Sequence, residues 1–263
     1  MTTQNARKLN ALEQTLPQGL LVDAQWMEER GYSTSLRSQY VAAGWLVQPV
    51  RGTYKRPLGD LTWQKVVVSL QSLLHRDLMV GGRTALELQG FAHYLTASGP
   101  TTIHLYGQKS APGWLTKLPL KERFLFHRTQ TLFKHPLSPE QSTLSQYTTS
   151  NSDIPLKMST PERAFIELLD ELPNNESFHQ VDMLVEGLRT LSPKRLQMLL
   201  EGCRSIKVKR LFFWFSDRHR QPWLDQLDRK KIDLGTGKRM LVKGGTLDPK
   251  YHITVPSDLN APV

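Results

Sequence analysis

The sequence lacks several features that would place it in a well-defined class. A single cysteine among 263 residues, Cys203, excludes an internal disulfide and a cysteine-based metal cluster, and it fits a reducing cytoplasm. No stretch approaches the run of about 18 apolar residues that a transmembrane helix needs. Arg7 and Lys8 are not followed by the apolar segment of a signal peptide. We therefore expect a cytoplasmic protein that does not bind a membrane.

The motifs of common enzymes are also missing. The eight histidines include no H-E-x-x-H motif and no pair spaced by four residues, and Ser159 lacks the flanking glycines of a nucleophile elbow. Two short matches, Asp228-x-Lys230 and Asp248-x-Lys250, resemble the acidic-x-Lys end of metal-dependent nucleases, which combine metal-binding carboxylates with a lysine near the scissile phosphate. We expect no catalysis, no cofactor and no bound metal. A metal-dependent DNA nuclease with a DNA-reading module stays open as the alternative.

The sequence does contain an excess of positive charge. Its 34 Lys and Arg against 24 Asp and Glu give a formal net charge of +10 and a pI near 9.7, which indicates a polyanionic partner. The excess is uneven: +2 for residues 1–60 (7 basic, 5 acidic), +5 for 61–150 (9 and 4), −3 for 151–200 (5 and 8) and +6 for 201–263 (13 and 7). The first sixty residues are therefore not the most basic part of the chain.

The stretch from 32 to 57, YSTSLRSQYVAAGWLVQPVRGTYKRP, begins with a predicted short helix. Ser33 or Thr34 can cap this helix by accepting a hydrogen bond from an early backbone N–H. Gly44 is expected to end it in the left-handed conformation. The apolar side chains that share one face at helical spacing are Leu36, Tyr40 and Val41.

A basic hairpin is predicted directly after this helix. Segments 45–50 and 53–55 are expected to be strands, and Arg51 and Gly52 form the tight turn because glycine readily adopts the positive φ that such a turn needs. Pro49 has no N–H to donate to a strand ladder, so its strand is expected at an edge.

Two further helices are predicted upstream. Residues 5–15 carry leucines at helical spacing, residues 20–22 form a short extended piece, and Asp23 caps a helix over 24–30 that Gly31 closes. Helices followed by a capped helix and a basic hairpin are typical of a winged helix-turn-helix, in which one helix enters the major groove and the wing touches the DNA backbone. A generic small α+β segment with a few exposed arginines is the alternative interpretation.

The winged interpretation predicts which side chains contact DNA. Arg can form paired hydrogen bonds with guanine and Gln with adenine, whereas Ser and Thr near the start of a helix suit phosphates. The expected contacts are Ser35, Arg37, Ser38 and Gln39 on the recognition helix, and Arg51, Lys55 and Arg56 in the wing.

Gly81 and Gly82, which precede a predicted helix, raise the possibility of a phosphate-binding loop. The match is weak because the Gly-Lys-Ser/Thr ending and the complete G-x-G-x-x-G spacing are both absent. The simpler interpretation is that the glycines turn the chain into a packed helix, whose apolar face consists of Ala85, Leu86 and Leu88.

The rest of the chain is predicted to mix helices and strands. Thr160, Pro161 and Glu162 have the cap, first-position proline and early acidic residue that begin a helix. The other predicted elements are helices at 63–74, 181–188, 193–201 and 208–219, strands at 101–106 and 123–128, and a polar loop at 141–154 with a short strand near 145–147.

The predicted helix at 208–219 is dense in aromatic residues and has basic residues at both ends. A helix with so many aromatic residues is usually buried in a core, with the basic residues at its ends exposed to solvent. The alternative is that its cations contact nucleic acid or an acidic protein. Further basic residues follow in a strand-like tail.

Several motifs, taken in order, resemble the abortive-infection AbiE antitoxin (AbiEi) family. GGRTALELQGFAHYL at 81–95 is similar to the segment joining the two halves of these proteins, and the Arg-Gly-x-Tyr turn at 51–54 fits their N-terminal module. STPERA at 159–164, KVKRLFFWFSDRHRQPWLDQLD at 207–228 and GKRMLVKGGTLDPKYHITVP at 237–256 resemble their C-terminal domain. The resemblance covers nearly the whole chain.

The resemblance implies an antitoxin of a type IV toxin–antitoxin pair, encoded beside a nucleotidyltransferase-like toxin. The winged helix is expected to bind inverted repeats in double-stranded DNA at its own promoter and to repress transcription. The C-terminal domain is expected to counter the toxin, with or without a stable complex.

The fold that follows is α+β. An N-terminal winged helix-turn-helix, at about 5–57 within a DNA-binding region 1–93, precedes a larger mixed α/β antitoxin domain at 94–263. The expected antitoxin surface consists of Lys207, Lys209, Arg210, Arg218, Arg220, Lys238, Arg239 and Lys243.

Overall fold

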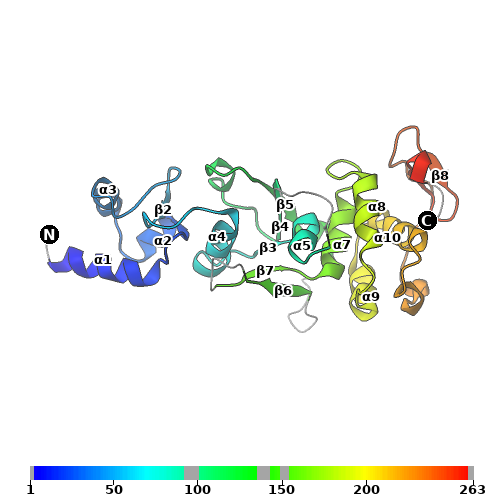
Figure 1. Cartoon of the computed structure of the whole chain (residues 1–263), viewed down its shortest axis with the longest axis horizontal. Helices are drawn as coiled ribbons and strands as arrows, with labels where there is room; N and C mark the ends of the chain where they lie inside the picture. Colours follow the sequence, from blue (N-terminus) through cyan, green and yellow to red (C-terminus); the bar gives the residue numbers. More distant parts are fainter. Residues whose placement is uncertain (1–2, 92–100, 135–142, 149–153, 260–263) are drawn as a thin grey trace. The chain divides into compact units, whose positions relative to one another are not determined.

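A computed structural model describes residues 3–91, 101–134, 143–148 and 154–259. The chain forms an α+β fold of helices and short strands that divides into two compact units (Figure 1). Unit 1 comprises 1–79, 101–126 and 146–157, and unit 2 comprises 80–100, 127–145 and 158–263. The expected boundary between residues 93 and 94 lies outside the described residues, as do residues 141–142 and 149–153 of the expected loop at 141–154.

The first part of unit 1 has the element order predicted for a winged module. Its helices and strands bury a continuous apolar core that includes Leu12, Leu16, Trp26 and Tyr40. The elements, labelled in Figure 1, are α1 (Thr3–Thr15), β1 (Leu21–Asp23), α2 (Ala24–Glu29), α3 (Thr34–Ala42) and β2 (Thr53–Lys55).

The hairpin differs from the prediction in its pairing. β2 pairs antiparallel with β1, in the register Leu21↔Lys55, Val22↔Tyr54 and Asp23↔Thr53. The expected strand at 45–50 is reduced to one antiparallel bridge, Val47↔Lys55. Pro49 cannot donate a backbone hydrogen bond, which is consistent with this short pairing. The turn is as predicted: Gly52 has a φ of +84°.

The next helix of unit 1 supports the winged module. Thr62 caps α4 (Trp63–Val68) by accepting a hydrogen bond from the Lys65 N–H, and the chain continues as a π-helical turn, η1 (Ser69–Leu73). The Ser69 hydroxyl accepts a hydrogen bond of 2.8 Å from the backbone N–H of Leu21 in β1. This contact joins residues beyond the hairpin to the module, so unit 1 extends past the module's end at about 57.

Five short strands form the largest sheet, with the order β5-β4-β3-β7-β6. β3 and β7 run parallel, with Val80 opposite Met158. β7 was not predicted because it follows a polar stretch, and its four residues, LKMS, alternate apolar and polar over too short a run to stand out. The strands are β3 (Leu78–Val80), β4 (Thr102–Gly107), β5 (Arg123–Arg128), β6 (Leu144–Tyr147) and β7 (Leu156–Ser159), with η2 (Leu115–Lys117) and α6 (Thr129–Leu132) in the connections.

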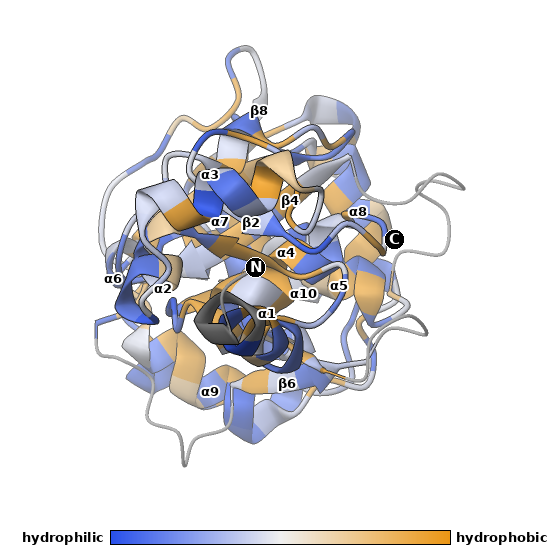
Figure 2. Ribbon diagram, turned by 90° about the vertical axis from the view of Figure 1, so that its left-hand side faces the viewer, coloured by the Kyte–Doolittle hydropathy of each residue, from blue (hydrophilic) through white to orange (hydrophobic). Residues whose placement is uncertain are grey.

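Unit 2 is built mainly from helices. The aromatic helix α10 (Ile206–Arg218) is a core helix, as predicted, with Phe212, Phe213 and Phe215 buried. Phe212 packs against Phe165 and Trp223 at ring-centroid distances of 5.3 and 5.4 Å. The other helices are α5 (Gly82–Leu88), α7 (Pro161–Asp170), α8 (Phe178–Glu186) and α9 (Pro193–Gly202). Figure 2 shows both hydrophobic and hydrophilic residues on α9, as expected of a helix buried on one side.

Asp217 of α10 contributes a carboxylate that binds several residues of the C-terminal segment. Asp217 accepts hydrogen bonds from Arg229, at 2.7 Å, and from Lys250 and Tyr251. Burial raises the pKa of Asp217, but these three hydrogen bonds outweigh it and hold the pKa below its usual value. The elements of this segment are η4 (Leu224–Gln226), η5 (Arg229–Lys231), the antiparallel pair β8 (Thr246–Asp248) and β9 (Ile253–Val255), and η6 (Ser257–Leu259).

No helix in the described part of the chain has both the length and the apolar character of a membrane span.

Candidate nucleic-acid interface

Helices α2 and α3 are separated by a turn as short as that of a helix-turn-helix. Only residues 30–33 separate them, and Gly31 in this turn has a φ of +78°, which suits a short turn that contains glycine. Each helix has its predicted cap: the Asp23 carboxylate accepts from the Trp26 N–H at 2.9 Å, and the Ser33 hydroxyl accepts from the Leu36 N–H at 3.3 Å. The two caps and the turn fix where α3 begins.

One face of α3 is buried and the other is polar and exposed. Leu36 and Tyr40 face the core, where the Tyr40 ring contacts the edge of Trp45 at a centroid distance of 5.3 Å. Ser35, Ser38 and Gln39 are exposed, as expected of residues that contact DNA. The exposed face of α3 therefore offers hydroxyl and amide groups, which can donate and accept hydrogen bonds at base edges or phosphates.

Arg37 is not on that exposed face, contrary to the prediction. It is 4% exposed. Its guanidinium donates to the carbonyls of Ala24 and Tyr32 at 3.2 and 2.9 Å and to the Thr34 hydroxyl at 2.9 Å. These bonds tie α3 to the start of α2 and to the turn, so Arg37 positions the helix and is not part of its exposed face.

The wing shows the same division between structural and exposed cations. Lys55 is 8% exposed, and its ammonium group donates to the carbonyls of Arg56, Pro57 and Gly59 at 2.7, 3.2 and 3.0 Å. Burial, together with the nearby charge of Lys65, lowers the pKa of Lys55. Lys55 was predicted to contact DNA, and this burial makes it a structural residue.

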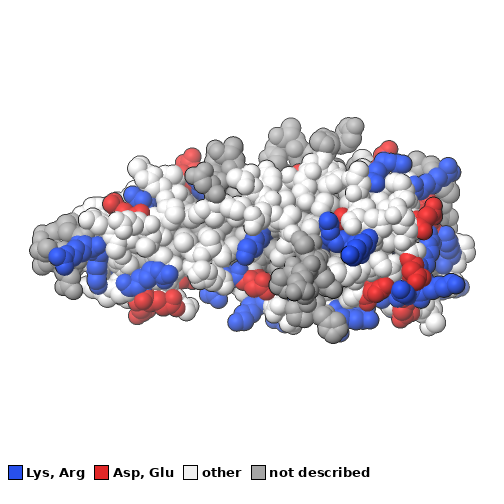
Figure 3. All heavy atoms as spheres, turned by 90° about the horizontal axis from the view of Figure 1, so that it is seen from below, with Lys and Arg blue, Asp and Glu red and all other residues white. Residues whose placement is uncertain are grey.

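The other two predicted wing contacts differ from each other. Arg56 is half-buried and forms an ion pair of 3.6 Å with Glu13 of α1, whereas Arg51 is exposed at the turn. Exposed Lys and Arg are scattered among Asp and Glu on the face shown in Figure 3. The net positive charge is therefore not gathered into one continuous basic surface on the described part of that face.

Four of the eight residues expected on the antitoxin surface are structural instead. Lys207 donates to the carbonyls of Asp170 and Leu172 at 2.6 and 2.8 Å, and Lys209 is buried. Arg218 donates to Asp182 and to the Leu259 carbonyl, at 2.9 and 2.7 Å. These cations were predicted at a surface because the sequence places them at the ends of an aromatic helix, but they hold neighbouring segments to that helix.

Arg210 is the clearest of these corrections. It is 2% exposed, and its guanidinium donates to the carbonyls of Leu234 and Gly237 at 2.7 Å each, and to that of His252 at 3.3 Å. Burial and the charge of Arg239 lower its pKa. The expected residues that remain exposed are Arg220, Lys238, Arg239 and Lys243.

The two short nuclease-like matches are explained by local structure. The Asp228 carboxylate caps a 3-10 turn by accepting from the Lys230 N–H at 3.1 Å, and the Asp248 carboxylate accepts from the Tyr251 N–H at 2.7 Å. Lys250 pairs with Asp217. Each aspartate therefore stabilises its own turn, and neither belongs to a converging set of carboxylates among the described residues.

A buried carboxylate also explains the glycine pair that resembled a phosphate-binding loop. Glu167 of α7 accepts from the Gly82 N–H at 3.0 Å and from the Ser159 hydroxyl at 2.8 Å, and forms an ion pair of 2.8 Å with Arg163. The N–H that would face a phosphate is thus bound inside the protein. Glu167 and Arg163 are four residues apart on one helix, but the sequence does not reveal their partners.

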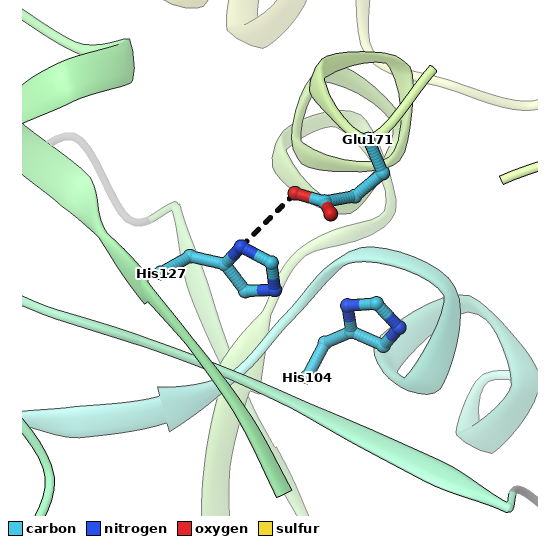
Figure 4. A group of neighbouring side chains, drawn as sticks. All are labelled: His104, His127 and Glu171. Atoms are coloured by element: carbon cyan, nitrogen blue, oxygen red, sulfur yellow. Dashed lines mark ion pairs between the residues drawn. The ribbon is translucent and has the colours of Figure 1, made fainter. Parts of the chain in front are cut away.

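His127 and Glu171 form an ion pair of 3.0 Å in unit 2 (Figure 4). His104, the third side chain labelled in Figure 4, belongs to β4 of unit 1. The cysteine Cys203 is buried, and burial raises its pKa to about 11, so its thiol is protonated at neutral pH.

Two family models together match almost the entire chain. The first, described as "Transcriptional regulator, AbiEi antitoxin, Type IV TA system", matches residues 100–256, and the second, the AbiEi antitoxin N-terminal domain of a transcriptional regulator, matches residues 5–97. The chain belongs to the AbiEi antitoxin family. The predicted resemblance is thereby confirmed, and the family's description makes this AbiEi protein a transcriptional regulator and an antitoxin of a type IV toxin–antitoxin system.

A solved structure supports the fold of this AbiEi protein. The crystal structure of the RV2827C protein from Mycobacterium tuberculosis matches with a TM-score of 0.63 and 19% sequence identity, over 96% of this chain and 91% of the other. At that identity the likeness shows the fold alone. No curated protein matches the chain.

Proposed function

We propose that this AbiEi protein represses its own operon through a winged helix-turn-helix formed by α2, α3 and the hairpin. The observation that carries the proposal is the exposed polar face of α3, with Ser35, Ser38 and Gln39 held outward by a buried Arg37. A helix that enters the major groove needs such side chains to reach base edges. The exposed Arg51 at the turn is placed to neutralise a phosphate.

We assign the two proposed functions, DNA binding and toxin neutralisation, to the two parts of the chain that the two family models match. Residues 1–93 read inverted repeats at the promoter, and residues 94–263 counter a nucleotidyltransferase-like toxin from the same operon without any catalysis of their own. The charge distribution supports a role for the second part, because residues 201–263 carry a net charge of +6 (13 basic, 7 acidic). The antitoxin would act in the cytoplasm, where both DNA and toxin are found.

Point variants of the full-length chain test this proposal better than a deletion. Removing the winged module would break the hydrogen bond between Leu21 and Ser69 and expose the core of unit 1. A mobility-shift titration on the DNA upstream of the operon should show specific binding by the wild type. The triple variant Ser35→Ala, Ser38→Ala, Gln39→Ala should bind that DNA no better than random DNA.

Cleavage and neutralisation provide separate tests. Incubation with Mg²⁺ and DNA should yield no cleavage products, and Mg²⁺-dependent cleavage that Asp248→Ala abolishes would support the nuclease alternative instead. The triple variant should still rescue cells that express the toxin. If that variant kept its stability but lost both repression and rescue, the proposal that the two functions lie in different parts of the chain would be contradicted.

A further inference from the structure

The exposed side of α3 is a stripe of residues without charge. Ser35, Ser38, Gln39 and Ala42 are spaced three or four residues apart, as on one face of a helix, and all four are exposed. The one charged residue of this helix, Arg37, is buried. Arginine paired with O6 and N7 of guanine is the most common specific contact in the major groove. The stripe therefore lacks the usual reader of guanine.

The hydroxyl groups of α3 offer little selectivity among bases. The Ser38 hydroxyl donates to the Thr34 carbonyl one turn earlier, at 3.0 Å, which leaves its oxygen as an acceptor. The Thr34 hydroxyl accepts from the Arg37 guanidinium at 2.9 Å. Ser35 has a single hydroxyl, which suits several base edges as well as phosphates. None of these hydroxyls selects one base by itself.

Gln39 differs because its amide has a donor and an acceptor on separate atoms. Its side chain makes no hydrogen bond with another described residue, so both groups are available. In the major groove adenine presents the complementary pair, an N7 acceptor beside an N6 donor. Guanine presents two acceptors there, and cytosine and thymine present one hydrogen-bonding group each. Adenine is thus the base that satisfies both groups of Gln39 at once.

The backbone that carries Gln39 is held by contacts on the far side of the helix. Arg37 binds the carbonyls of Ala24 and Tyr32, as described above. The Tyr32 hydroxyl donates to the Lys8 carbonyl at 2.9 Å, which connects the residue before α3 to α1. A side chain on a helix that is fixed in this way is positioned more precisely than one on a loop.

We infer that Gln39 is the residue of α3 that specifies a base in the operator, and that this base is adenine. Ala42, three residues further along the stripe, offers the methyl group that packs against the methyl group of thymine. The stripe therefore suits A·T pairs and provides no paired hydrogen bonds to guanine. The inference rests on the proposed function, in which α3 reads the promoter, and goes beyond it in naming the base and the side chain.

The first experiment selects binding sites from a pool of random duplex DNA, so the operator need not be known beforehand. Full-length wild type, Gln39→Ala and Gln39→Arg are compared with Gln14→Ala, an exposed glutamine of α1, as the control. Gln39→Ala should lose a preference for adenine of about 5- to 150-fold at one position of the site and keep the rest of the selected sequence. Gln39→Arg should select guanine at that same position, and the control should select the wild-type site.

The second experiment removes one acceptor from the DNA instead of changing the protein. In the site selected by the wild type, 7-deazaadenine replaces the adenine at that position, so the N7 acceptor is lost while the N6 amino group stays. Mobility-shift titrations should show wild-type binding weakened about fivefold or more. Binding by Gln39→Ala should not weaken further, because the partner of N7 is already gone.

The outcomes separate the inference from the proposed function. If the wild type has a preferred sequence that Gln39→Ala leaves unchanged, another residue reads the operator, and the inference is overturned while the proposed function stands. A preference lost at a G·C pair, or an equal effect of 7-deazaadenine on both proteins, would overturn it in the same way. A wild type that selects no sequence would refute the proposed function itself. Unchanged melting temperatures confirm that each variant is folded.

Discussion

The winged module of unit 1 and the helical body of unit 2 use arginine and lysine in the same two ways. In each, a cation on or beside a helix is buried and holds neighbouring backbone: Arg37 in unit 1 and Arg210 in unit 2 both donate to main-chain carbonyls. In each, exposed cations also lie in turns and loops, such as Arg51 in unit 1 and Lys238 in unit 2. The comparison shows that a basic residue near aromatic residues on a helix can be buried and can hold neighbouring backbone in place by hydrogen bonds.

The largest effect is expected when the buried cation of unit 2, Arg210, is replaced. Replacing it with Met removes the donor for the Leu234 and Gly237 carbonyls, and we expect a loss of about 3 kcal/mol in the free energy of unfolding. Urea titration of Arg210→Met measures this loss, and Lys230→Met, at an exposed position, should change stability by no more than about 0.5 kcal/mol. Equal stabilities of the two variants would show that Arg210 is not a clamp.

The corresponding change in unit 1 is Arg37→Ala. We expect it to lower the free energy of unfolding by about 2 kcal/mol, because the Ala24 and Tyr32 carbonyls lose their donor. At a temperature where the variant is folded, the ratio of its affinities for operator and random DNA should equal that of the wild type. A reduced ratio in a folded variant would mean that Arg37 reads a base.

Substitutions of Gln39 and Arg51 should distinguish recognition of the DNA sequence from electrostatic attraction to its phosphates. Gln39→Ala should leave stability unchanged and weaken operator binding by about 1–3 kcal/mol, with little effect on random DNA. Arg51→Ala should weaken binding to both DNAs alike and lower the salt dependence by about one phosphate contact. Mobility-shift titrations over a series of salt concentrations measure both effects. The opposite assignment, with Arg51 specific and Gln39 indifferent, would place base reading in the wing.

The smallest expected effect concerns pH. Since hydrogen bonds hold the pKa of Asp217 below its usual value, its contribution to stability is complete at neutral pH. That contribution declines when the pH falls below about 4 and through the depressed pKa. Asp217→Asn should therefore be less stable than wild type at pH 7, and the difference should shrink in acid. A difference that is the same at pH 7 and in strong acid would show that the charge of Asp217 does not hold the C-terminal segment.

Much of the fold could be predicted from the sequence, because local signals determine its helices. The caps at Asp23 and Ser33, the glycine turns at 31, 44 and 52, and the aromatic core helix were all predicted and are confirmed. The strand β7 and the pairing of β2 with β1 were not, since short strands depend on partners distant in sequence.

The candidate site was less predictable than the fold. Periodicity placed Arg37 away from the apolar face of α3, yet the backbone carbonyls of Ala24 and Tyr32 draw its guanidinium inward. The sequence does not show which backbone carbonyls need a hydrogen-bond donor from another segment. A cation that fills this structural role therefore cannot be distinguished by sequence from one that contacts DNA.

The most direct test of the central claim is one mobility-shift comparison with full-length protein on the DNA upstream of its operon and on random DNA. The variants are Ser35→Ala, Ser38→Ala, Gln39→Ala together, and Gln14→Ala, an exposed glutamine on α1, as the control. We predict that the triple variant loses the preference for the upstream DNA while the control keeps it. A triple variant that keeps the full preference would contradict the assignment of α3 as the helix that reads DNA.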